Sequence, residues 1–150
     1  MRIVIQRVSE ASVEIDKKVA GQIEQGLMLL VGIEEADTKE DVEWLCRKIV
    51  NMRIFGDDKG NMNLSLIDVG GGALVISQFT LHASTKKGNR PSFIKAAKPD
   101  FAEQKYEEFK QTLSSYLGKE IQSGKFGADM KVSLINDGPV TLLLDSKNKE

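Results

Sequence analysis

Leu27-Met28-Leu29-Leu30-Val31-Gly32-Ile33 is the stretch that decides the fold class, because six of its seven residues are large and apolar. A strand with one exposed face alternates apolar and polar side chains, whereas a strand covered on both faces is apolar throughout. The run therefore predicts a central strand. Ala73-Leu74-Val75-Ile76, which follows three glycines, is a second short run of this kind and predicts another.

An amphipathic helix is predicted after each central strand. Thr38 suits the N-cap of the first, with Asp41 in the first turn. Pro99 suits the first turn of the second helix, and Gly118 suits its end. Apolar residues recur at helical spacing in both segments, as Val42, Leu45, Cys46, Ile49 and Met52 and as Ala102, Tyr106, Phe109, Leu113 and Leu117. Membership of this stripe favours a core role for the single cysteine.

The flanking segments are predicted to be strands. Ile3, Ile5, Val13 and Ile15 follow the period of two, and a polar turn at 16–18 leads into a second run at 19–23. A turn is predicted at 56–61, and strands at 120–123, 130–135 and 140–145. The order of two strands, two strand–helix units and three strands predicts one α/β domain over residues 1–150, with both helices packed on the sheet. The charged residues 146–150 are predicted to be a flexible tail.

Composition excludes several classes of protein. The chain is 41% hydrophobic and 29% charged, as expected of a folded globular domain. One cysteine and one histidine allow neither an internal disulfide nor a His/Cys metal cage, and no D-x-D-x-D-G calcium loop is present. No metal or cofactor is expected, although a carboxylate-only cation site stays open. Without a signal peptide or an apolar span, we expect a cytoplasmic protein that is not bound to a membrane.

Ser77-Gln78-Phe79-Thr80-Leu81 places two hydroxyls and an amide where the second central strand ends. Such positions often carry binding groups, yet the same side chains commonly satisfy backbone groups at strand ends. A Thr80 nucleophile would need a positioned base. His82 would share a face with Thr80 if the strand continued, but a packed or solvated histidine is favoured.

The loop from Lys86 to Lys98 is the strongest local charge anomaly. It holds five basic residues and no acid in a chain of formal net charge −1. Contact with phosphates and a solvated lysine-rich loop explain this pattern equally well.

Asn136-Asp137-Gly138-Pro139-Val140-Thr141 interrupts the last two predicted strands. A hairpin turn is the simplest interpretation. The alternative is a functional Gly-Pro bond, because a cis X-Pro bond directs backbone carbonyls where a trans bond cannot.

Five blocks of the sequence, in order, resemble D-aminoacyl-tRNA deacylases. The SQFTL segment at 77–81 and the NDGPVT segment at 136–141 match two motifs of that family. The opening MRIVIQRV, KGNRPSF at 87–93 and GKFGADM at 124–130 are similar to three more. The resemblance covers essentially the whole chain.

The resemblance implies a domain of β/β/α layers that works as a homodimer with active sites at the subunit interface. Gly138 and Pro139 of one subunit would enter the partner's site as a cis peptide, whose carbonyls reject L-amino acids and admit D-amino acids or glycine. Ser77, Gln78, Phe79 and Thr80 would frame the catalytic pocket. The tRNA would contact the residues Arg7, Lys86, Lys87 and Arg90.

Two questions of mechanism and function stay open at this stage. We favour water activated by the terminal 2′-hydroxyl of the tRNA over attack by Thr80, because no base for Thr80 is visible. Hydrolysis of an aminoacyl-tRNA ester is the leading function. A non-catalytic nucleic-acid-binding dimer and a hydrolase of free D-amino acid derivatives are the alternatives.

Overall fold

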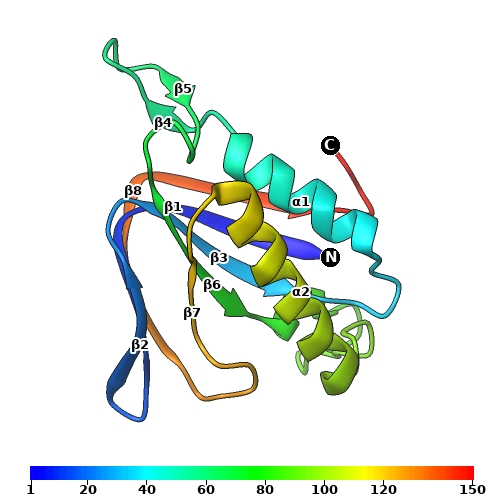
Figure 1. The fold of residues 1–150 in the computed structure, drawn as a ribbon. Coiled ribbons are helices and arrows are strands. Elements are labelled where there is room, and N and C mark those ends of the chain that lie inside the picture. Colours follow the sequence, from blue (N-terminus) through cyan, green and yellow to red (C-terminus); the bar gives the residue numbers. More distant parts are fainter.

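The computed structural model describes residues 1–150 as one α/β domain with two helices packed on a mixed sheet (Figure 1). The elements follow in the order β1 (Arg2–Ile15), β2 (Lys18–Ile23), β3 (Gly26–Gly32), α1 (Lys39–Asn51), β4 (Phe55–Gly56), β5 (Met62–Leu64), β6 (Gly72–Ser77), the 3-10 helix η1 (Phe79–His82), α2 (Pro99–Leu117), β7 (Gln122–Ser123) and β8 (Lys131–Asp145).

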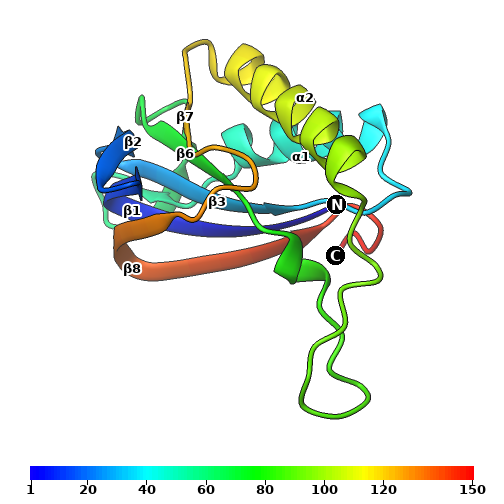
Figure 2. The same ribbon diagram turned by 90° about the horizontal axis from the view of Figure 1, so that it is seen from below.

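The main sheet is organised around the long strand β1. On one edge, β1 pairs antiparallel with β3 over its first half and with β2 over its second half. On the other edge it pairs with β8 along nearly its whole length. The strands β6 and β7 extend the sheet beyond β3 in parallel pairs. The sheet curves so strongly that β2 comes to lie beside β7 (Figure 2).

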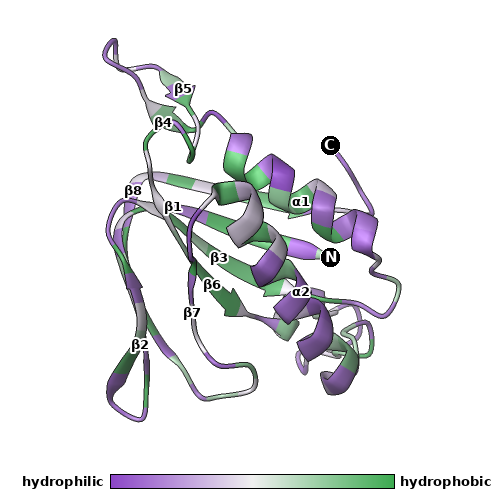
Figure 3. Ribbon diagram, viewed as in Figure 1, coloured by the Kyte–Doolittle hydropathy of each residue, from purple (hydrophilic) through white to green (hydrophobic).

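Both helices cover the same face of the sheet. The crossovers β3–α1–β6 and β6–α2–β7 step in the same direction along the sheet, and right-handed connections therefore place both helices on one side. The larger core lies between this face and the helices, and a second cluster lies on the opposite face. β3 and β6 are hydrophobic along most of their length, whereas α1 and α2 mix both kinds of residue (Figure 3).

The central strands and both helices are confirmed. Thr38 caps α1 through a capping box with Asp41, and Gly118 ends α2 in a left-handed conformation. Cys46 is fully buried in the larger core, and burial raises the pKa of its thiol. Neither α1 nor α2 combines the length and apolar character needed to cross a membrane.

The prediction of three C-terminal strands is wrong. The segments 130–135 and 140–145 are parts of one 15-residue strand, β8. Asn136–Pro139 is therefore not a hairpin turn, because the chain keeps its direction and continues to pair with β1. A small hairpin of β4 and β5, which flanks the predicted turn at 56–61, was not foreseen.

The first two residues of the segment predicted to be a flexible tail make specific contacts. Ser146 is buried and its hydroxyl accepts a hydrogen bond from the backbone amine of Met1. Lys147 Nζ lies 2.6 Å from a carboxylate oxygen of Asp41. Burial alone would raise the pKa of Asp41, but hydrogen bonds from Lys147, Thr38 and Ser146 hold it well below its usual range.

A close approach of two strands gives a test of this architecture. Gly26 of β3 faces Gly72 of β6, and a Cβ at Gly26 would lie 2.0 Å from the Gly72 carbonyl oxygen. We expect Gly26→Ala to lower the free energy of unfolding by about 1–3 kcal/mol, as overpacking in a core does. Urea unfolding measures it. Gly56→Ala, where nothing lies within 4 Å, is the control, and equal losses in the two variants would contradict the pairing.

Candidate active site

The SQFTL segment lies where β6 leaves the sheet. Ser77 pairs with Val31 of β3, and the Gln78 amide donates the last ladder hydrogen bond, at 2.8 Å, to the Val31 carbonyl. The chain then turns into η1, so the strand does not continue and His82 does not share a strand face with Thr80. The backbone N–H groups of Phe79 and Thr80 begin this helix and donate to no acceptor within the chain. They are available to a ligand.

The side chains around Thr80 provide no base for its hydroxyl. The one hydrogen-bond partner of Thr80 Oγ1 is the side-chain amide of Gln78, which donates to it. His82 is 1% exposed, and neither of its ring nitrogens has a hydrogen-bond partner. The histidine is thus packed beneath the turn, as the sequence favoured, and the Ser-His-Asp arrangement is absent here.

A cavity of about 710 Å³ opens beside this segment. Ser77, Gln78 and Phe79 form part of its wall, whereas Thr80 does not line it. The remaining lining comes from β3 and the residue after it, Ile76 of β6, the loop before α2, the start of α2, the loop after β7 and Val132 of β8. Of the 17 lining residues, 12 are hydrophobic. No carboxylate lines the cavity. It is an apolar pocket with a few polar groups, as small-molecule sites commonly are.

The basic loop connects to the mouth of this cavity. Ser84 and Ser92 exchange two backbone hydrogen bonds that close its base, and residues 85–91 extend away from the sheet as an arm (Figure 2). Lys86, Lys87 and Arg90 are exposed on the arm and form no ion pair. Phe93, just beyond the base, packs edge-on against Phe79 with ring centroids 5.1 Å apart, and both rings line the cavity.

Gly138 and Pro139 lie elsewhere in the chain, beside Arg7. Their peptide bond is cis, and both residues are exposed. The Arg7 guanidinium donates to the Asp137 carbonyl at 2.9 Å and to the Ile54 carbonyl at 2.6 Å. Arg7 is therefore engaged within the chain and fixes the Gly-Pro segment. Gly138 has φ +133°, and a Cβ there would approach Arg7 Nη2 to 3.0 Å.

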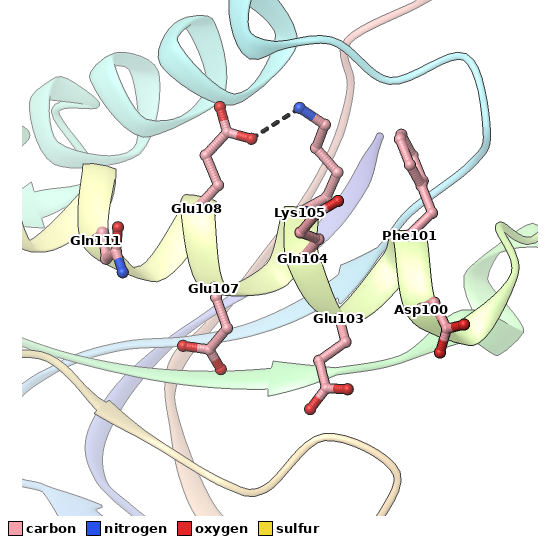
Figure 4. Close-up of a pocket in the computed structure, with 8 residues that line it drawn as sticks. All are labelled: Asp100, Phe101, Glu103, Gln104, Lys105, Glu107, Glu108 and Gln111. Carbon is pink, nitrogen blue, oxygen red and sulfur yellow. Dashed lines mark hydrogen bonds and ion pairs between the residues drawn. The ribbon is translucent and has the colours of Figure 1, made fainter.

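A second hollow runs along the exposed face of α2 and has a different character (Figure 4). Its lining includes the carboxylates of Asp100, Glu103, Glu107 and Glu108, and Lys105 is paired with the last of these at 2.7 Å. An acidic surface of this kind repels phosphates. The apolar cavity beside the SQFTL segment is therefore the better candidate for the site.

Comparison with known proteins agrees with this geometry. A family model described as D-Tyr-tRNA(Tyr) deacylase matches residues 4–145. The chain belongs to the D-Tyr-tRNA(Tyr) deacylase family. Proteins named D-aminoacyl-tRNA deacylase from Bacteroides fragilis (strain YCH46) and Flavobacterium johnsoniae are 63% and 62% identical to it over the full length of both chains.

Two solved structures share the fold of this deacylase family. One, named c-Myc DNA Unwinding Element Binding Protein, is 40% identical with a TM-score of 0.91 and covers 97% of this chain and 98% of its own. The other, described as a probable eukaryotic D-amino acid tRNA deacylase, has a TM-score of 0.83 at 16% identity, covers 95% of this chain and 97% of its own, and shows the fold alone.

Sequence reasoning missed part of the candidate site of this deacylase. The loop after β7 contributes Phe126, Gly127, Ala128 and Met130 to the cavity, and the loop before α2 contributes Ala96 to Lys98. Neither loop has a hydrophobic period that could reveal its role. The available signals were the similarity of residues 124–130 to a family block and the charge of the loop from Lys86 to Lys98, and neither assigned these residues to an apolar cavity.

Proposed function

We propose that the protein hydrolyses the ester bond between a tRNA and a D-amino acid or glycine, and that it rejects L-aminoacyl-tRNA. The observation that carries this proposal is the apolar cavity walled by Ser77, Gln78 and Phe79, with an unpaired basic arm at its mouth. Full-length relatives at about 60% identity that are named D-aminoacyl-tRNA deacylase support it. An aminoacyl group fits the cavity while the arm meets the polyanion.

Backbone donors, rather than a side-chain nucleophile, account for the chemistry. The free N–H groups of Phe79 and Thr80 are suited to hold the ester carbonyl and the negative charge that develops on its oxygen. An aminoacyl ester is already activated, and the neighbouring 2′-hydroxyl of the terminal ribose can position water against it. Water adds to the carbonyl carbon, the ester C–O bond breaks, and the ribose oxygen leaves with a proton.

Substitution at Thr80 separates the two mechanisms. We expect Thr80→Ala to keep D-aminoacyl-tRNA hydrolysis within about tenfold of the unmodified enzyme, because no base activates the hydroxyl. Removing the terminal 2′-hydroxyl of the tRNA should lower kcat far more. Single-turnover release of labelled amino acid measures both. A fall of about 10³-fold or more for Thr80→Ala alone would establish the threonine as nucleophile.

Two contacts support action of the Gly-Pro segment on a second copy of the chain. Within one chain Arg2 donates to the Leu81 carbonyl in η1, whereas Arg7 holds the Gly138 segment. The two arginines are five positions apart in β1, so their Cα atoms are roughly 17 Å apart. This separation supports a site in which the Gly-Pro segment of one subunit serves the cavity of its partner.

The surface of β8 supports such a partner. β8 is an edge strand, and its Leu143 and Ile135 side chains are 66% and 54% exposed. An edge strand with exposed apolar residues readily associates with another chain. We therefore assign the uncovered β8 face to a homodimer with both cavities at or near the interface.

Heterodimers test whether selection crosses the subunit boundary. Gly138→Ala, with its positive φ and crowded Cβ, should displace the segment and admit L-aminoacyl-tRNA. Ala128→Trp should fill the cavity and abolish turnover. With the two changes on different subunits, the intact cavity meets an unaltered partner segment. We expect that heterodimer, isolated by two affinity tags, to hydrolyse D-substrate and reject L-substrate.

The matched control places both changes on one subunit beside an unmodified one. The intact cavity then meets the altered segment and should hydrolyse L-aminoacyl-tRNA. If Gly138 and Pro139 acted within their own chain, the results for the two heterodimers would be exchanged. Amino acid release from D- and L-aminoacyl-tRNA is measured for each.

The arm supplies the tRNA contacts in this proposal, through Lys86, Lys87 and Arg90. We expect Lys86→Glu/Lys87→Glu to weaken tRNA binding and to reduce the slope of log Kd against log salt by about two, because two phosphate contacts are lost. Lys17→Glu/Lys18→Glu, an exposed pair at the junction of the β1–β2 turn and β2, is the charge-matched control. Equal affinities of the two variants at low salt would remove the arm from the interface.

Release of amino acid distinguishes the alternatives. The 40%-identical structure is named a DNA unwinding element binding protein. That name favours a non-catalytic nucleic-acid-binding dimer as the second candidate function. Such a dimer would bind charged tRNA without releasing amino acid. A hydrolase of free D-amino acid derivatives would cleave simple D-amino acid esters as fast as D-aminoacyl-tRNA.

A further inference from the structure

The Gly-Pro segment leaves the β1–β8 ladder as a bulge with a narrow neck. Gln6 pairs with Thr141 and Val8 pairs with Asn136, so Arg7 alone faces the four residues from Asp137 to Val140. The side chains of Gln6 and Val8 lie on the same side of the sheet, because they are two residues apart in a strand. Their partners Thr141 and Asn136 therefore also lie on that side, where they mark the two ends of the bulge.

The Gln6 carboxamide joins these two ends. Gln6 Oε1 accepts a hydrogen bond from Asn136 Nδ2 at 2.7 Å and another from the Thr141 hydroxyl. The second hydrogen on Asn136 Nδ2 points to Thr141 Oγ1 at 3.3 Å, and Asn136 Oδ1 accepts the Val140 backbone N–H at 3.4 Å. Each hydrogen in this network is used once. Both neck side chains donate to Gln6 Oε1, so the Gln6 carboxamide joins them as an acceptor.

We propose that Gln6 is a positioning residue for chiral selection, which closes the neck of the bulge and so fixes the direction of Gly138 and Pro139. This inference rests on the proposed function of that segment. The neck contact is separate from the Arg7 contacts, which are made to backbone carbonyls within the bulge and at Ile54. Gln6 lines no part of the cavity and contacts no residue of η1 through a hydrogen bond. Its loss should therefore change selection without changing hydrolysis.

Gln6→Leu and Gln6→Glu test the acceptor directly. Leucine removes it, whereas a carboxylate accepts from the same two donors. We expect Gln6→Leu to raise kcat/KM for L-aminoacyl-tRNA about five- to tenfold, as the loss of one or two exposed hydrogen bonds predicts, with kcat for D-aminoacyl-tRNA within twofold. Gln6→Glu should keep the ratio of kcat/KM for D- and L-aminoacyl-tRNA that the unmodified enzyme has.

Thr141→Val provides an independent test, because it removes one neck donor and keeps the shape of the side chain. We expect it to relax selection less than Gln6→Leu, and the Gln6→Leu/Thr141→Val double variant to resemble Gln6→Leu alone. Gln111→Leu, on the exposed face of α2, is the control for the change of residue type. Thermal unfolding shows whether each variant is folded at the assay temperature.

The outcomes separate this inference from the proposed function. If Gly138→Ala relaxes selection while Gln6→Leu leaves the D/L ratio unchanged, the proposed function stands and the role of Gln6 is wrong. An equal fall of D and L turnover in Gln6→Leu and Gln6→Glu would also overturn it, because that pattern indicates general structural damage. If the unmodified enzyme does not discriminate between D- and L-aminoacyl-tRNA, the proposed function and this inference fall together.

Discussion

The antiparallel ladder between β1 and β8 is the constraint on which the rest of the structure depends. It runs along nearly the full length of both strands, and β1 carries β3 and β2 on its other edge. β8 cannot shift its register without turning Leu142 and Leu144, which pack on the larger core, towards the opposite face. The ladder therefore fixes the point at which the four residues of the bulge, Asp137 to Val140, must leave it.

The bulge is then held from both faces of the ladder. Gln6 and Arg7 are consecutive in β1, so their side chains point to opposite sides. Gln6 joins the ends of the bulge, and Arg7 binds the Asp137 carbonyl within it. A backbone segment that is to select a ligand by shape must resist displacement by the ligand it rejects. Contacts from two sides meet that requirement at an exposed position where no core packing is available.

Most of the fold was predictable because its central elements have strong local signals. The apolar run at 27–33, the capping pair of Thr38 and Asp41, and the Pro99 and Gly118 boundaries each act within a few residues. The single strand β8 was not predictable in this way. Asn, Asp, Gly and Pro at 136–139 favour a turn locally, and only their pairing with distant β1 residues keeps the chain in one direction.

The candidate site was predictable to a smaller extent. The hydroxyl and amide groups of the SQFTL segment were visible from sequence, but the turn into η1 that frees the Phe79 and Thr80 N–H groups depends on where β3 stops pairing at Val31. The arm was recognisable by charge alone. Its position beside the cavity follows from the Ser84–Ser92 closure and the Phe79–Phe93 contact, which join residues that no periodic pattern relates.

Selection by a fixed backbone has a consequence for substrate range. A steric barrier acts only on a side chain that points towards it, so it rejects every L-amino acid regardless of side-chain chemistry. Glycine has no side chain to reject and passes as a D-amino acid does. A tighter barrier would not change this, because the hydrogen of glycine is smaller than any D side chain that must be admitted. In the proposed mechanism, the breadth of L-rejection and the admission of glycine therefore have the same physical origin.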